Sequence, residues 1–215
     1  KKKKKIEAFV AENEGDVFHR PLWLQAIAHG TGNSARGLIA ERGGRLAGWL
    51  PLSDVHSPLF GRALVSSGFG VGGGVLAARD DDARRLCRAA EELAGRLSAA
   101  SVELRGGSAP ADWTTICGKH ANFAAELAAD DEAQLLAIPR KARAEVRKGL
   151  KYDLTVTTGT AETDRSAHYA VYAQSVRNLG TSVFPRTLFD AVLEGFGDDA
   201  DILTVRQGEL PVASV

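Results

Sequence analysis

The stretch Ile138-Pro-Arg-Lys-Ala-Arg-Ala-Glu-Val-Arg-Lys-Gly-Leu-Lys151 divides the chain and decides how its fold is interpreted. It holds six basic residues and one acid, in a chain of 215 residues whose formal net charge is zero. Proline suits the first turn of a helix and glycine suits its end, so Pro139 and Gly149 predict a short helix between them. At about 100° per residue, apolar and basic side chains fall on opposite sides of this helix. The apolar stripe is Ile138, Ala142, Val146 and Leu150, and the basic row is Arg140, Arg143, Arg147 and Lys151.

The basic side of this predicted helix has two interpretations. Arginine binds phosphate and carboxylate through paired hydrogen bonds, which favours a site for a phosphorylated donor, a nucleotide-linked acceptor or an RNA backbone. The alternative is a solvated helix face between two domains, because charge runs are common on such faces. If the site exists, we expect the arginine row to line a cleft between the two halves of the chain. The candidate ligands are Arg140, Lys141, Arg143, Arg147 and Lys148.

Length and composition indicate a globular protein of one or two domains, with 44% hydrophobic and 25% charged residues. No apolar run approaches the length of a membrane span. The lysines from Lys1 to Lys5 look like a tag or a disordered tail, and the residues after them are too acidic for a signal-peptide core. Cys87 and Cys117 fit no disulfide or metal-ligand spacing. We therefore expect both to be reduced and buried in a cytoplasmic protein, with no metal site.

The residues before the basic stretch predict a helix, a hairpin, further strands and a second helix. The hairpin signal is Gly43-Gly44 between two strand-like runs. Asp80 to Asp82 supply the cap and acidic first turn of the second helix. The expected helices are 18–29 and 80–99, and the expected strands are 37–42, 45–55, 63–67, 101–105 and 122–127.

The strand over 63–67 runs into Gly68-Phe-Gly-Val-Gly-Gly-Gly74. Residues 68–73 match G-x-G-x-x-G, but no helix opens on these glycines, which argues against a dinucleotide site. Glycines directly after a strand indicate a bulge or a close approach of backbone, so we expect Gly70 to Gly74 to interrupt strand pairing. Alternatively, at least two free N–H groups among Gly72, Gly73 and Gly74 would face a ligand carbonyl or phosphate.

The residues after the basic stretch repeat the order seen between 18 and 67. A strand over 154–158 is followed by helices over 167–179 and 185–196, then by strands over 201–206 and 210–215. Such an internal repeat predicts two related units. We expect a first unit over 6–137, a connecting helix over 138–151 and the start of a second unit over 152–215. The chain would then be a fragment that lacks the later strands of the second unit.

Several stretches resemble FemAB-like proteins of the acyl-CoA N-acyltransferase (GNAT) superfamily, in particular the subgroup associated with PEP-CTERM/exosortase systems. The resemblance covers nearly the whole chain past the lysines, and residues 138–149 and 175–181 carry its most specific motifs. It implies an α+β fold with a mixed, mostly antiparallel sheet flanked by helices, as one full unit and the truncated start of a second. The other motifs are Phe18-His-Arg-Pro-x-Trp23, Ala40-Glu-Arg-Gly-Gly44, Leu50-Pro-Leu52, Leu59-Phe-Gly61, Val102-Glu-Leu-Arg105 and Pro211-Val-Ala-Ser-Val215.

The resemblance also implies a reaction. FemAB relatives transfer amino acids from aminoacyl-tRNA to peptidoglycan precursors, and GNAT relatives transfer acyl groups from coenzyme A. We therefore expect acyl or aminoacyl transfer to an amine of a small-molecule, lipid-linked or nucleotide-linked precursor of the cell envelope or of an exopolysaccharide. Acyl-CoA or aminoacyl-tRNA would be a donor substrate, with no tightly bound cofactor. The family usually has a Tyr before its paired glycines, where this chain has Val71, and the donor strand of the second unit lies beyond residue 215, so the fragment is expected to be inactive alone.

Attack by an amine on an ester or thioester requires loss of a proton, stabilisation of the carbonyl oxygen and alignment of the two groups. Asp54 and His56, at the end of a predicted strand, are the candidate bases, together with His19. Two other functions compete with the enzyme. One is a non-catalytic module that binds RNA or a sugar nucleotide, and the other is a structural unit whose basic helix joins two GNAT-like halves. The residues expected to complete a polar wall are Tyr172, Ser175, Arg177 and Asn178.

Overall fold

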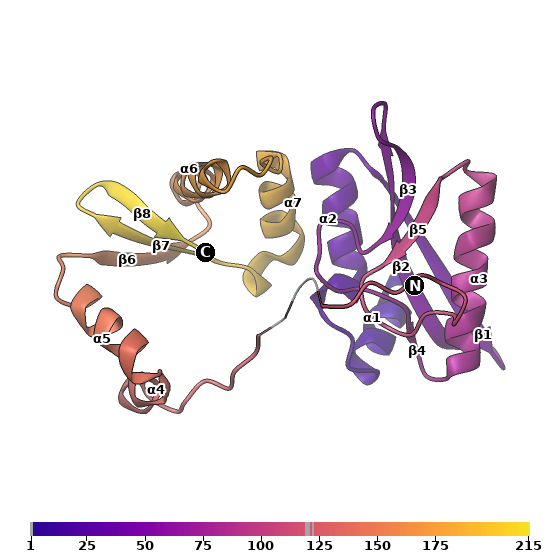
Figure 1. The fold of residues 1–215 in the computed structure, drawn as a ribbon, viewed down its shortest axis with the longest axis horizontal. Coiled ribbons are helices and arrows are strands. Elements are labelled where there is room, and N and C mark those ends of the chain that lie inside the picture. The colour runs from indigo at the N-terminus through magenta and orange to yellow at the C-terminus, as the bar shows by residue number, and fades with distance from the viewer. Residues whose placement is uncertain (1, 119–120, 122) are drawn as a thin grey trace. The chain divides into compact units, whose positions relative to one another are not determined.

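The computed structural model describes residues 2–118, 121 and 123–215 (Figure 1). Contacts between residues divide the chain into two compact units. Unit 1 runs up to Thr115 and adds Phe184–Ala200, whereas unit 2 comprises Ile116–Val183 and Asp201–Val215. The boundaries predicted from sequence, 6–137, 138–151 and 152–215, follow chain order and stay a prediction. The structural grouping follows packing instead, and it places one late helix with the early part of the chain.

Unit 1 contains a mixed sheet in the order β1-β2-β3-β5, with the short β4 also paired to β2. β1, β2, β3 and β4 pair antiparallel, whereas β5 joins β3 in parallel. Gly43 and Gly44 both have positive φ, which forms the tight turn between β1 and β2 that the paired glycines predict. The strands are β1 (Ser34–Arg42), β2 (Arg45–Ser57), β3 (Gly61–Ser66), β4 (Leu76–Ala77) and β5 (Ser101–Leu104).

Helices cover both faces of this sheet (Figure 1). On one face α3 packs on the main core, which includes Leu50, Leu52 and Leu64 from the strands. On the other face α1 and α2 enclose a smaller core around Trp49. The helical elements of unit 1 are α1 (Lys2–Glu12), the 3-10 turn η1 (Val17–His19), α2 (Pro21–Thr31), α3 (Asp80–Arg96), α7 (Arg186–Phe196) and the 3-10 turn η2 (Gly197–Asp199).

Helix α7 packs directly against α2, although the two are far apart in sequence. The hydroxyl of Thr187 donates to the carbonyl of Gly30 at 2.5 Å. A Cβ atom on Gly30 would lie 2.5 Å from Leu188 Cα, so the glycine is what lets the two backbones approach so closely. This contact assigns α7 to unit 1.

Unit 2 has a three-stranded antiparallel sheet in the order β6-β7-β8, with α6 packed on β7 and β8. Its core is thin, and the buried residues among those described are Ala167, Ile202 and Thr204. The elements of unit 2 are α4 (Asp131–Ala137), α5 (Arg140–Gly149), β6 (Thr155–Gly159), α6 (Glu162–Asn178), β7 (Ile202–Gln207) and β8 (Leu210–Ser214).

Three local expectations from the sequence are wrong. Lys2 to Lys5 are helical, because they form the first turns of α1, which is anchored by the buried Phe9 and Val10. The strand expected over 122–127 is absent, since residues 123–127 are irregular and exposed; Asn122 lies outside the described residues. Cys87 is buried as expected, but Cys117 is exposed. The alanines of 122–127 have weak strand propensity, so only packing would have made a strand there.

Candidate functional site

The glycine segment, Gly68–Gly74, leaves the sheet immediately after β3 ends at Ser66. Its own hydrogen bonds form a tight turn, because Ser67 N–H donates to the Gly72 carbonyl at 3.1 Å and Gly70 N–H donates to the Ser67 carbonyl at 3.2 Å. Gly73 has a φ of 83°, a conformation that favours glycine. The interruption of strand pairing expected from the glycine density is therefore present.

Close contacts explain why glycines are needed along this segment. A Cβ atom on Gly70 would lie 2.5 Å from the Phe18 ring, and one on Gly72 would lie 2.2 Å from an oxygen of Asp16. At Gly74 the added atom would lie only 1.9 Å from the Gly106 carbonyl oxygen. These distances are far below van der Waals contact, so a side chain at any of the three positions would displace its neighbours.

Three polar side chains hold the glycine segment by hydrogen bonds to its carbonyl groups. Trp23 Nε1 donates to the Gly68 carbonyl at 3.2 Å, and the guanidinium of Arg105 donates to the Gly70 carbonyl. His19 Nε2 lies 3.1 Å from the Gly74 carbonyl, which can only accept, so this nitrogen carries the proton. His19, Trp23 and Arg105 thus shape the segment, a role that sequence reasoning missed. The signal was available in the motif from Phe18 to Trp23, whose first, second and last residues all contact the segment.

The N–H groups of Gly72, Gly73 and Gly74 donate no hydrogen bond to any described residue. The buried hydroxyl of Ser67 also lacks a partner there. These free polar groups match the predicted ligand cradle, whose binding role stays a prediction. The Asp16 carboxylate lies against Gly72, and a negative charge there opposes an anion. A neutral carbonyl oxygen therefore suits this position better than a phosphate.

The candidate base Asp54 is buried on β2 and paired with two arginines. Arg62 donates to both carboxylate oxygens, at 2.7 and 2.8 Å, and Arg36 contacts one of them at 3.3 Å. Hydrogen bonding from Arg62 lowers the pKa of Asp54 by more than burial raises it. A carboxylate with a lowered pKa accepts a proton poorly, so this geometry favours a structural role for Asp54. His56, two residues further on the same strand, is exposed.

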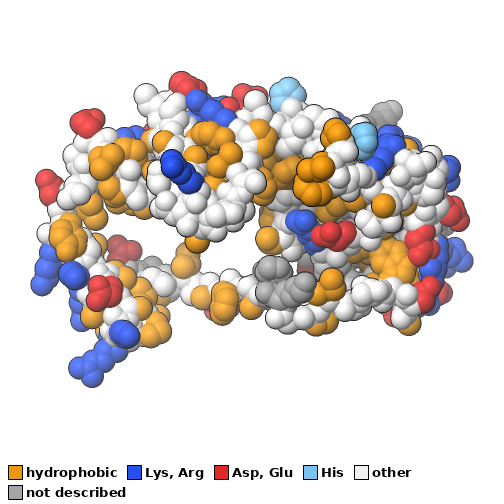
Figure 2. Space-filling view, turned by 45° about the horizontal axis from the view of Figure 1, so that its top comes forward, with side chains coloured by type: hydrophobic (Ala, Val, Ile, Leu, Met, Phe, Trp, Pro, Cys, Tyr) orange, Lys and Arg blue, Asp and Glu red, His pale blue; other side chains and the backbone are white. Residues whose placement is uncertain are grey.

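The predicted basic helix is present as α5, with Pro139 as its N-cap residue. Its apolar stripe is not buried as expected, since Val146 is 40% and Leu150 75% exposed. Arg143 is engaged locally, donating to the Ile138 and Leu136 carbonyls at 2.9 Å, where it closes the end of α4. Figure 2 shows Lys and Arg side chains gathered over α4 and α5. The members of this group without a carboxylate partner among the described residues are Arg140, Lys141, Arg147 and Lys148.

The expected polar wall lies on the last turns of α6 in unit 2. Tyr172 is half-buried, and its ring is tilted by 39° to that of Tyr169, with ring centroids 6.1 Å apart. Asn178 accepts a hydrogen bond from Gln174 at 2.9 Å. Ser175 and Arg177 are exposed on the same turn. The four residues are thus near one another on one helix, while their role, like the cleft expected beside the arginine row, stays a prediction.

The described residues contain neither a membrane-spanning helix nor a cluster of metal ligands. No helix among them is both long and apolar enough to cross a membrane. No group of three or more His, Cys, Asp or Glu side chains among them is arranged to hold a metal ion.

Comparisons with known proteins give a fold but no family assignment. Neither a protein-family model nor a curated protein matches the sequence. Among solved structures, FemX is similar with a TM-score of 0.63 at 16% sequence identity, over 94% of this chain and 56% of FemX. The chain therefore has a FemX-like α+β fold and spans about half the length of FemX. At this identity the likeness shows the fold alone, as the resemblance of the motifs implied.

Proposed function

We propose that this chain is part of a FemAB-type transferase that moves an aminoacyl or acyl group onto an amine of a cell-envelope or exopolysaccharide precursor. The FemX-like fold is the observation that carries the proposal. The motifs that resemble FemAB-like proteins of PEP-CTERM/exosortase systems add the finer expectation about the acceptor. Because the chain spans about half of FemX, the active form in this proposal is the longer protein.

The glycine segment supplies the N–H donors that acyl transfer needs to stabilise the carbonyl oxygen. When an amine attacks an ester or thioester, negative charge develops on the carbonyl oxygen, and preorganised N–H donors stabilise it. The free N–H groups of Gly73 and Gly74 are such donors, and Arg105 and His19 hold the backbone of the segment in place. The N–H group of Gly72 is also free, but the Asp16 carboxylate beside it opposes negative charge at that position. In this proposal the segment receives the carbonyl of the transferred group.

The proton acceptor is assigned to His56 rather than to Asp54. Two arginines lower the pKa of the Asp54 carboxyl group. By contrast, the imidazole of His56 forms no hydrogen bond or ion pair with any described residue. A neutral imidazole is the usual proton acceptor near neutral pH. A full-length His56→Gln variant with unchanged kcat/KM would remove this assignment and leave the transferase proposal standing.

The cations of α5 are assigned to the charged part of a substrate. Arg140, Lys141, Arg147 and Lys148 are exposed and lack carboxylate partners among the described residues, so they can bind the phosphates of coenzyme A, of tRNA or of a nucleotide-linked precursor. Arg143 joins them only by giving up its bonds to the carbonyls of α4. Tyr172, Ser175, Arg177 and Asn178 would complete the polar wall of the same site.

A second candidate is a module that binds RNA or a sugar nucleotide without chemistry of its own. The observation that favours it is the thin core of unit 2, which presents the unpaired cations of α5 but no buried catalytic group among its described residues. The two candidates differ in turnover rather than in affinity.

The experiment is an assay of the full-length protein with acyl-CoA or aminoacyl-tRNA as donor and amine-bearing envelope precursors as acceptors. Mass spectrometry of the acceptor then detects the added acyl or aminoacyl group. A product that appears with the wild type and falls in the Arg140→Ala/Arg147→Ala variant supports the transferase. Saturable binding of donor or acceptor with no product from any pair would favour the binding module, and neither binding nor product would reject both.

A further inference from the structure

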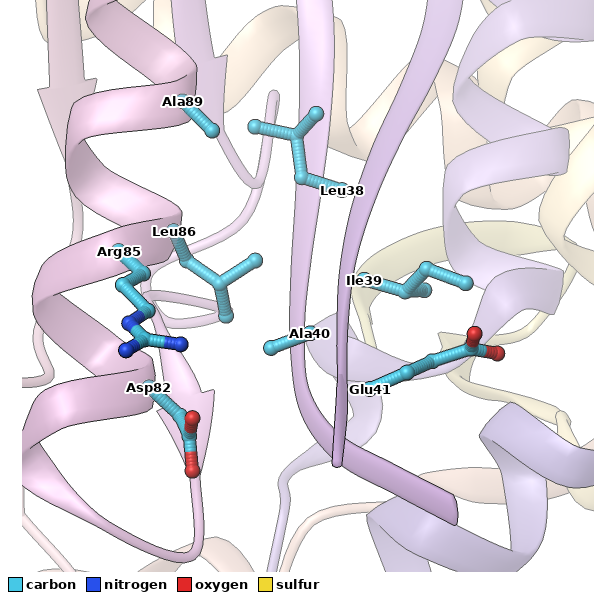
Figure 3. A pocket seen from close by; sticks show the side chains of 8 residues that line it. All are labelled: Leu38, Ile39, Ala40, Glu41, Asp82, Arg85, Leu86 and Ala89. Carbon is cyan, nitrogen blue, oxygen red and sulfur yellow. The ribbon is translucent and has the colours of Figure 1, made fainter. Parts of the chain in front are cut away.

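A separate pocket of about 270 Å³ lies between α3 and β1, on the side of the sheet that faces the main core. Figure 3 shows Leu38 and Ala40 pointing from β1 toward α3, while the side chains of Ile39 and Glu41 point away from the helix. Ile39 and Glu41 therefore line the pocket with their backbone atoms. β1 is the edge strand of the sheet, so part of that backbone has no neighbouring strand. The lining residues of α3 are Asp82, Arg85, Leu86 and Ala89.

Asp82 is the polar residue of this pocket that needs explanation. It is only 3% exposed, yet one of its two carboxylate oxygens has no hydrogen-bond partner. The other oxygen, Oδ1, accepts a hydrogen bond from Arg42 at 2.9 Å. A buried carboxylate oxygen without a donor is unfavourable, so the site is suited to a donor that arrives from outside the chain. The donor that pairs best with a carboxylate is a cationic N–H group.

Arg85, one turn further along α3, supplies the opposite charge. Residues three apart on a helix are neighbours, and two other pairs at this spacing on α3, Asp81 with Arg84 and Arg88 with Glu91, form ion pairs. Asp82 and Arg85 have the same spacing and both line the pocket, but they form no ion pair. Within the described residues Arg85 forms no hydrogen bond and no salt bridge, and it interacts with Asp81 only through longer-range electrostatics. One wall of the pocket thus contains a buried carboxylate oxygen without a hydrogen-bond donor and an exposed guanidinium without a hydrogen bond or salt bridge.

The remaining walls are apolar and small. Leu38 and Ala40 face Leu86 and Ala89 across the pocket (Figure 3). A ligand complementary to these lining residues therefore has an ammonium group for Asp82, a carboxylate close to it for Arg85 and a short aliphatic part for the apolar side chains. That combination is the structure of a free aliphatic α-amino acid.

We propose that the pocket between α3 and β1 binds a free α-amino acid with a small aliphatic side chain. Its ammonium group pairs with Asp82, its carboxylate with Arg85, and its side chain packs between Leu86 and Leu38. The site is distinct from the glycine segment and from α5, and the proposal does not depend on the transferase activity.

The experiment is a titration of the 215-residue chain with L-valine at millimolar concentrations, followed by NMR spectra of its backbone amides and methyl groups. We expect saturable shifts centred on Leu38, Ala40 and Leu86. N-acetyl-L-valine lacks the ammonium group and L-valinamide lacks the carboxylate, so each should bind at least about tenfold more weakly, the loss expected for one charge-assisted contact. Equal binding of either analogue would overturn the proposal, as would the absence of saturable shifts with L-valine.

Variants test the same assignment from the protein side. Arg85→Gln should weaken valine binding at least about tenfold, because it removes the carboxylate ligand on an exposed part of α3. Arg84→Gln, its exposed neighbour outside the pocket, is the matched control and should bind like the wild type. If Arg85→Gln binds valine as tightly as Arg84→Gln does, the proposal fails. Asp82→Asn should also lose binding, and the valinamide and N-acetyl-valine results stand even if that variant does not fold.

Discussion

The glycine segment and the basic helix α5 are built in opposite ways. Side chains from η1, α2 and the chain after β5 bond the carbonyls of the glycine segment, and its α-carbons lie in close contact with their neighbours. Helix α5 has no buried residue, and its hydrogen bonds come from its own sequence and from the end of α4. The comparison shows that the shape of the glycine segment depends on tertiary contacts, whereas α5 keeps its helical shape almost without them. Substitutions should therefore change the free energy of unfolding more in the glycine segment than in α5.

Gly74→Ala should have the largest effect. Its new Cβ atom would lie 1.9 Å from the Gly106 carbonyl oxygen, which forces the backbone to move. We expect a loss of about 3 kcal/mol, the upper range for overpacking a well-packed site. Urea denaturation followed by tryptophan fluorescence measures it, since Trp23 and Trp49 both lie in unit 1.

The matched control for Gly74→Ala is Gly95→Ala. Gly95 lies in α3 with nothing within 4 Å of its Cβ position, so alanine should raise the free energy of unfolding by about 0.5 kcal/mol through helix propensity. Equal stability of the two variants would mean that the glycine segment is not held by close contacts.

Asp54→Asn should come next, with a loss of about 2 kcal/mol at neutral pH, because a buried carboxylate that pairs with Arg62 and Arg36 is replaced by a neutral group. The pKa of Asp54 is lower in the folded protein than its ordinary value of 3.8. The ionic contribution is therefore fully present above that pH and is lost as the pH falls through the folded-state pKa. Unfolding free energies of wild type and variant, measured from neutral to acidic pH, should begin to converge below about pH 4 and should meet only below the folded-state pKa.

A control on the same strand is His56→Gln, which should change the free energy of unfolding by less than about 0.5 kcal/mol, because the side chain is exposed. A difference between wild type and Asp54→Asn that stays constant down to acidic pH would show that the ion pairs do not carry the stabilisation.

Arg143→Gln should affect only the short helix α4. It removes hydrogen bonds to the Ile138 and Leu136 carbonyls, and we expect about 1 kcal/mol of local helix stability to be lost. The carbon chemical shifts of Asp131–Ala137 measure this helix directly. Arg147→Gln, at an exposed position of α5, should leave the shifts of α4 unchanged. If both variants shift α4 alike, the local bonds of Arg143 are not what holds it.

Arg140→Ala and Arg147→Ala should barely change stability, within about 0.5 kcal/mol, because both side chains are exposed. If α5 binds a phosphorylated ligand, each should instead weaken binding of coenzyme A, a uridine-diphosphate sugar or aminoacyl-tRNA about ten- to a hundred-fold. Affinity should also fall as salt rises, since exposed phosphate contacts are screened. Titration of the full-length protein at low salt checks this, and ligand affinities equal to wild type in both variants would leave α5 as a connecting helix.

The sequence by itself determined the elements whose signals are local. Glycines with positive φ form the turn between β1 and β2, acidic residues occupy the first turn of α3, and Pro139 is the N-cap residue of α5, because each effect acts within a few residues of the chain. The cap expected from Asp80 to Asp82 is wrong, because the N-cap residue of α3 is Arg79 and no side chain caps the helix. The fold class followed from the order of these elements and from the motifs. The break after β3 was predictable for the same reason, since glycines at that density do not continue a strand.

Only the tertiary structure decided which residues meet. It places α7 against α2 through Gly30, and it brings Asp16, His19 and Trp23 to the glycine segment across about fifty positions of sequence. It also gives Asp54 two arginine partners, which turns a candidate base into a paired carboxylate. These outcomes depend on contacts between distant segments, and the free energy of such contacts arises only when packing brings the segments together. Residue type and local spacing do not predict which distant residues become partners, such as Arg62 and Arg36 for Asp54.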